Sequence, residues 1–121
     1  YMIVDDSLRP TPDGFEVDIR ITYYRGLGLS MIEAFEVTVD GDPVPRKDIR
    51  FVLRGTAYTH DEMEREGDVR WEFGEIATLS VRRPGGLAAG VHAIRVAQQL
   101  RVSYMPDPLR GQDEKNLVLA A

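Results

Sequence analysis

The chain contains no cysteine. Disulfide bonds and thiolate metal sites are therefore excluded, and the fold must rest on packing and backbone hydrogen bonds. Its apolar runs are only a few residues long, whereas a membrane-spanning helix needs about 20 apolar residues in a row. The first residues also lack the basic region of a signal peptide. We therefore expect a soluble cytoplasmic protein that has no contact with a membrane.

Cations are fewer than anions. The 15 Lys and Arg residues stand against 20 Asp and Glu residues, which gives a net charge of -5. Proteins that bind nucleic acids take much of their affinity from clustered Lys and Arg side chains. A nucleic-acid partner is therefore not expected.

Most of the chain follows the two-residue period of a β-strand. Apolar and polar residues alternate over five segments, 15–23, 35–39, 49–53, 77–81 and 94–104. Alternation of this kind buries one face of a strand and exposes the other. The apolar positions predict one core, which includes Phe15, Val17, Ile19, Ile21, Phe35, Val37, Leu79, Val81, Ile94 and Val96.

Two local patterns predict a turn and a helix. Asp40-Gly41 tolerates positive φ angles, which is typical of a hairpin turn. Thr59 and Glu62 have the spacing of a capping box and predict a short helix that ends before Gly67. Several short strands with a single helix indicate an all-β fold, an antiparallel two-sheet β-sandwich with one short helix.

The chain shows neither an internal repeat nor a linker, so we expect residues 1–121 to form one domain. Regular structure is predicted to end at the C-terminus, where Pro106 and Pro108 precede the polar run 110–116. Residues 106–121 are therefore interpreted as a tail that is either disordered or held by another molecule.

Residue types that carry chemistry are scarce. His60 and His92 are the only histidines, and neither has a second ligand at metal-binding spacing. The serines lie in no nucleophile-elbow motif, and the glycines of residues 25–30 lack the pattern of a phosphate-binding loop. We predict no catalytic residue, bound cofactor or metal in this chain. Gln98, a polar residue on an apolar face, predicts a bulge or a hydrogen-bonded core amide.

Irregular segments rich in aromatic, Met and Arg residues predict a surface for a protein partner, because such side chains are common in interface hot spots. The predicted interface consists of Tyr24, Arg25, Met31, Arg70, Trp71, Phe73, Tyr104 and Met105. Trp71 is expected to be its exposed anchor. The alternative for Trp71 and Phe73 is a half-buried position in a strand.

Six stretches of the chain, in this order and spacing, resemble one protein family. They are YYRGLGLSMIE at 23–33, VDGDPVP at 39–45, DIRF at 48–51, RWEFGE at 70–75, PGGL at 84–87 and VSYMP at 102–106. Nearly the whole chain is thus similar to the small (beta) subunit of bacterial C-glycoside deglycosidases.

The resemblance implies a hetero-oligomer whose large (alpha) subunit, a TIM barrel, holds the catalytic groups and a divalent metal ion, Mn²⁺. Its implied substrate is a 3-oxo-C-glycoside, in which elimination cleaves the carbon–carbon bond between sugar and aglycone. This chain would be the non-catalytic subunit that stabilises or completes the large one. Two alternatives remain open: a stand-alone carbohydrate-binding module that uses Tyr24, Tyr58 and Trp71 as stacking platforms, and an independent enzyme.

Overall fold

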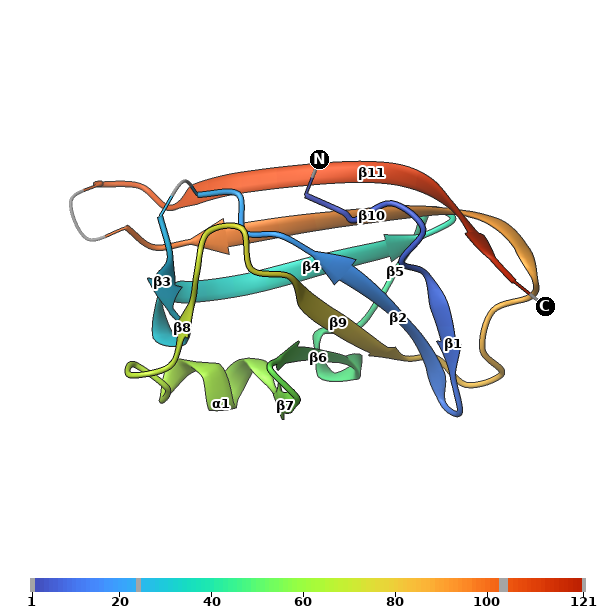
Figure 1. Cartoon of the computed structure of the whole chain (residues 1–121), viewed down its shortest axis with the longest axis horizontal. Coiled ribbons are helices and arrows are strands. Elements are labelled where there is room, and N and C mark those ends of the chain that lie inside the picture. Colours follow the sequence, from blue (N-terminus) through green and yellow to red (C-terminus); the bar gives the residue numbers. More distant parts are fainter. Residues whose placement is uncertain (1, 24, 103–104, 121) are drawn as a thin grey trace.

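The structure is a computed structural model that describes residues 2–23, 25–102 and 105–120. Two antiparallel sheets face each other across a shared apolar core (Figure 1). The predicted all-β fold is therefore confirmed.

The first sheet has the strand order β1-β2-β9-β6-β7. In β2 the apolar residues Phe15, Val17 and Ile19 are fully buried, because their parity points them toward the other sheet. The strands comprise β1 (Arg9–Thr11), β2 (Gly14–Ile19), β6 (Ile49–Leu53), β7 (Thr56–Tyr58) and β9 (Ala77–Arg82).

The second sheet has the strand order β11-β10-β4-β5. Asp40 and Gly41 join β4 to β5 with φ angles of 49° and 87°, which confirms the predicted hairpin turn. The strands comprise β4 (Ile32–Val39), β5 (Asp42–Pro43), β10 (Gly90–Leu100) and β11 (Leu109–Leu119).

Strand β11 corrects the prediction that regular structure ends at Pro106. It pairs with β10 along its whole length, from Leu109 opposite Leu100 to Leu119 opposite Gly90. The polar run hid this strand because its inward positions 111, 113 and 115 contact the Thr22 side chain, the Ile3 N–H and the Asp5 carboxylate rather than apolar side chains. In particular, Asp113 Oδ2 accepts the N–H of Ile3 at 2.9 Å.

Three short elements and one small sheet complete the fold. The predicted capping box is present: Glu62 N–H donates to Thr59 Oγ1, and the Glu62 side chain accepts from the Thr59 N–H. The elements are α1 (His60–Glu64), the 3₁₀ turns η1 (Leu29–Met31) and η2 (Arg46–Asp48), and the paired strands β3 (Leu27–Gly28) and β8 (Arg70–Trp71).

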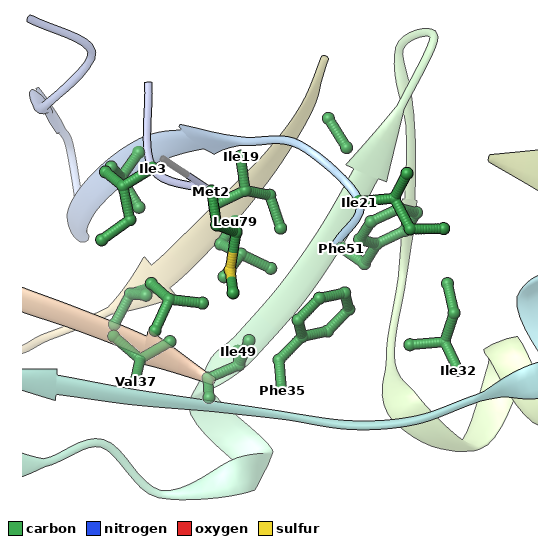
Figure 2. Packing of buried hydrophobic residues seen from close by; sticks show 14 of the residues in the cluster. Met2, Ile3, Ile19, Ile21, Ile32, Phe35, Val37, Ile49, Phe51 and Leu79 are labelled. Carbon is green, nitrogen blue, oxygen red and sulfur yellow. The ribbon is translucent and has the colours of Figure 1, made fainter. Parts of the chain in front are cut away.

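The core fills the space between the sheets. All ten core residues predicted from the sequence are at most 5% exposed, so this prediction is confirmed. Figure 2 shows Ile19, Leu79 and Phe51 of the first sheet on one side of the core, and Val37 and Phe35 of the second sheet on the other. The rings of Phe35 and Phe51 stack with their centroids 5.3 Å apart, and the stacked pair lies beside Trp71.

Candidate partner-binding end of the sandwich

Three segments that carry predicted interface residues meet at one end of the sandwich, at the left in Figure 1. We call this region the end surface; of the described residues it comprises 20–23, 25–31, 67–76, 101–102 and 105–108. Strand β3 pairs with β8, and the Arg70 guanidinium donates to the carbonyl oxygen of Gly26 at 2.8 Å. The N–H of Arg101 donates to the carbonyl oxygen of Met31, also at 2.8 Å. Strand pairing and hydrogen bonds to backbone carbonyl oxygens therefore join segments that lie far apart in the sequence.

Trp71 does not have the exposed position expected of a partner anchor. Its side chain is 0% exposed and packs edge-on against Phe51, with ring centroids 5.1 Å apart. Its indole N–H donates to the carbonyl oxygen of Glu75 at 2.8 Å. The expectation is wrong because β8 pairs with β3 and directs the indole inward, beneath the loop that follows.

Phe73 is the exposed aromatic residue of this loop, with an exposed fraction of 64%. The N–H of Glu75 donates to the carbonyl oxygen of Glu72 at 3.0 Å and closes a four-residue turn. Gly74, third in this turn, has φ 85°, a conformation that glycine adopts without steric cost. Phe73, second in the turn, is therefore presented to solvent by a backbone with a defined shape.

The Glu75 side chain strengthens this turn. Its carboxylate accepts the N–H of Glu72 at 3.1 Å and forms an ion pair with Arg54. Partial burial acts to raise the pKa of Glu75, but the hydrogen bonds from Arg54 and from the backbone of Glu72 prevail and lower it. Glu75 is thus held ionised, and the turn that carries Phe73 is fixed at its base.

The other predicted interface residues have different environments. Arg70 and Arg25 are exposed, Met31 is half-buried, and Met105 packs partly against the core. Tyr24 and Tyr104 lie outside the described residues. The binding role of this set stays a prediction.

A cleft of about 670 Å³ opens beside Phe73. Met2, Ile21 and Phe73 provide its apolar lining, and Asp5, Arg20 and Lys115 its charged lining. Gly111 and Gln112 of β11 form one wall. Sequence patterns did not reveal this cleft, because its walls come from the N-terminal segment, residues 20–22 and the unpredicted strand β11.

Gln98 holds one wall of the cleft in place. Its side chain is 0% exposed, and its amide N–H donates to the carbonyl oxygen of Arg20 at 2.8 Å. Its Oε1 accepts from both the backbone N–H and the hydroxyl of Thr22, each at 3.2 Å. Gln98 is therefore the hydrogen-bonded core amide predicted as one alternative, and it attaches residues 20–22 to β10.

Both histidines have structural partners. His60 is buried and its Nε2 accepts the N–H of Phe35 at 3.1 Å, while burial lowers its pKa from 6.5 to about 4. The His92 ring lies between the carbonyl oxygen of Ala88 at 2.6 Å and Asp40 Oδ2 at 2.7 Å. These two acceptors, Ala88 first, raise the pKa of His92.

The described part of the chain has neither a metal-binding cluster nor a membrane-spanning helix. There, no group of three or more His, Cys, Asp or Glu residues is arranged to hold a metal ion. No helix among the same residues is long and apolar enough to cross a membrane.

The sugar-stacking alternative depended on three aromatic platforms. Trp71 is buried, and Tyr58 is half-buried against the core. Tyr24 lies outside the described residues. Trp71 therefore offers no ring face to a sugar, which weakens this alternative.

Comparison with known proteins identifies the family. The family model described as "C-glycoside deglycosidase beta subunit" matches residues 1–104. The chain is 36% identical over 93 residues to a C-glycoside deglycosidase beta subunit from Eubacterium cellulosolvens, covering 77% of this chain and 63% of the relative. It is 35% identical over 106 residues to the 3'-dehydrocarminate deglycosidase beta subunit of a Microbacterium species, covering 87% and 79%. The match thus spans less than two thirds of the Eubacterium protein. The chain belongs to the C-glycoside deglycosidase beta subunit family.

Proposed function

We propose that this chain is the non-catalytic small subunit of a hetero-oligomeric C-glycoside deglycosidase and that it binds the large subunit through the end surface. In this proposal the large subunit is a TIM barrel that holds a divalent metal ion, Mn²⁺, and the catalytic groups. The complex is a cytoplasmic carbon–carbon lyase that separates sugar from aglycone in a 3-oxo-C-glycoside. A substrate oxidised in this way agrees with the name of the 3'-dehydrocarminate deglycosidase relative.

The exposed position of Phe73 is the observation that carries the docking proposal. A turn with its own hydrogen bonds presents this ring, which is 64% exposed. An aromatic side chain held in this way buries a large apolar area and loses little conformational entropy when a partner binds. Phe73 therefore takes the place that the sequence had suggested for Trp71.

The environments of the two histidines support a non-catalytic part for this chain. His60 uses Nε2 to accept a backbone hydrogen bond inside the core, and His92 contacts acceptors with both ring nitrogens. A general acid or base has to exchange its proton with a substrate within hydrogen-bond reach. Both imidazoles instead form hydrogen bonds with other groups of this chain.

Substitution of Phe73 tests the docking proposal. Phe73→Ala is expected to weaken binding of the large subunit by roughly 2 kcal/mol or more, the size typical of a hot spot. Val118→Ala is the matched control, because Val118 is 62% exposed on β11, which runs to the opposite end of the sandwich (Figure 1). Calorimetric titration of the large subunit with each variant gives both affinities. Equal affinities for wild type and Phe73→Ala would contradict docking through this ring.

An activity assay tests the division of labour. Three samples are each incubated with a 3-oxo-C-glucoside and Mn²⁺. They are this chain alone, the large subunit alone and a mixture of the two. Release of the aglycone is expected to be greatest for the mixture and absent for this chain alone. Cleavage by the isolated chain would show that it is an enzyme in its own right.

A further inference from the structure

Strand β11 is the edge of the four-stranded sheet, and the direction of its backbone groups follows from its neighbours. Ala93 and Asp40 share a backbone hydrogen bond at 2.9 Å, so the backbone groups of Ala93 face β4. Because these directions alternate along a strand, Ile94 faces β11, where its partner is Lys115. Odd-numbered residues of β11 therefore bond to β10. Even-numbered residues direct their N–H and C=O groups toward the open edge.

The second half of this edge is protected. The N–H of Glu114 donates to Asp113 Oδ1 at 2.9 Å, and Asp113 also accepts from Ile3. Lys115 reaches inward to Asp5 at 2.7 Å. Inward charges of this kind hinder the addition of another strand to an edge.

The first half of the edge, residues 109–112, borders the cleft beside Phe73. Arg110 and Gln112 direct their backbone groups outward, whereas Gly111 between them lies on the inner face, where a Cβ would come within about 2.8 Å of the Thr22 side chain. A strand paired here would direct alternate side chains toward the cleft. The cleft offers Phe73 and Ile21 to an apolar side chain.

The charges at the cleft indicate a second feature of the incoming strand. Asp5 is already paired with Lys115, and this ion pair occupies one side of the cleft. Arg20 is exposed beside it. A carboxylate on the incoming strand would complement Arg20.

We propose that an extended segment of the large subunit pairs with residues 109–112 as an additional edge strand. An apolar side chain of that segment lies against Phe73 and Ile21, and a carboxylate lies beside Arg20. The inference rests on the proposed function for the identity of the partner and adds the mode of binding. It also extends the interface from the end surface onto β11. Phe73 lies on the end surface and also lines the cleft that β11 borders.

Proline substitution separates this pairing from other contacts. Gln112→Pro removes an outward N–H while leaving the ladder with β10, since proline is tolerated where an edge N–H faces away from the sheet. We expect this variant to bind the large subunit at least about tenfold more weakly than wild type. Gln112→Ala keeps the N–H and loses only the side-chain bond to Arg95, so its affinity is expected to stay close to wild type. Asn116→Pro, at the same parity in the protected half, is also expected to bind normally.

Hydrogen exchange of the wild-type chain provides a second measurement that needs no variant to fold. The amides of Arg110 and Gln112 should exchange rapidly in the isolated chain and at least about tenfold more slowly in the complex with the large subunit. Exchange at Asn116 should change little. Unchanged exchange at Gln112 in a formed complex would overturn the strand pairing.

The outcomes distinguish this inference from the proposed function. If wild type forms no complex with the large subunit, the proposed function fails. If the complex forms and Gln112→Pro binds as tightly as wild type, only the strand pairing fails. If the isolated chain forms a dimer that Gln112→Pro disrupts, the edge pairs with a second copy and the inference is overturned.

Discussion

Trp71 donates its indole N–H to the backbone carbonyl oxygen of Glu75, 2.8 Å away, and so closes the loop that lies between them. The same indole is fully buried against the aromatic core. One side chain therefore connects the core of the sandwich to the turn that exposes Phe73. The proposed binding ring depends on the packing of the residue two positions before it.

Substitution of Trp71 should therefore lower stability. Trp71→Ala is expected to reduce the free energy of unfolding by about 3–5 kcal/mol, through lost apolar burial and the cavity left behind. Trp71→Phe keeps an aromatic ring but loses the bond to Glu75, and a cost of about 1–3 kcal/mol is expected. Urea unfolding of both variants measures these costs. A Trp71→Ala variant as stable as wild type would place the indole outside the core.

A second stability prediction concerns the centre of the core. Ile19 is 0% exposed, whereas Ile76, at the start of the segment leading into β9, is 47% exposed. Ile19→Ala is expected to cost on the order of 2–5 kcal/mol. Ile76→Ala is the matched control and should cost less than about 1 kcal/mol, because surface positions contribute little. Similar costs for the two variants in urea unfolding would contradict the assignment of the core.

The strands with one fully apolar face were predictable from the sequence. In β2 and in residues 35–39 of β4 the burial follows the alternation closely, because both segments face the opposite sheet. Strand β11 was not predictable in this way. Its inward positions 111, 113 and 115 are Gly, Asp and Lys, which contact polar groups of other segments. Alternation detects a strand only where its inner neighbours are apolar.

The contrast between Trp71 and Phe73 was also beyond the sequence pattern. The two residues have the same parity, so one continuous strand would direct both side chains to the same face. The turn that begins at Glu72 ends that strand, so the Trp71 ring is buried and the Phe73 ring is exposed. For the cleft, the only signal in the sequence was Gln98, a polar residue among apolar ones that proved to hold Thr22.

The protonation state of His60 can be tested directly. Its Nε2 accepts the N–H of Phe35, so the neutral ring must carry its proton on Nδ1. Burial, and secondarily the charge of Arg46, lower the pKa of His60 to about 4. Nitrogen-detected NMR titration should show the Nδ1–H tautomer at pH 6 and protonation only near pH 4. A ring that is charged at pH 6 would contradict this assignment.

Protonation of His92 should stabilise the folded chain, which is the opposite of the effect that protonation has at His60. A pKa raised by Ala88 and Asp40 means that the folded chain holds this proton more tightly than the unfolded chain does. The contribution is therefore fully present below 6.5, the ordinary pKa of the group, and is lost as pH rises through the folded-state value. The pKa of Asp40 is lowered, first by the hydrogen bond from His92 and then by the N–H of Ala93. Its contribution is present above 3.8, its ordinary pKa, and is lost as the pH falls below that value.

The clamp between His92 and Asp40 should thus be strongest between about pH 4 and 6.5, where both groups are charged. His60 opposes it in the same range, because a histidine with a lowered pKa destabilises the fold as pH falls. Wild type alone would mix the two effects, so wild type is compared with His92→Gln at each pH. The difference in unfolding free energy should be larger at pH 5.5 than at pH 8.5, because Gln keeps a neutral hydrogen bond but not the charge. An equal difference at both pH values would show that the His92 ring is not charged in the folded chain.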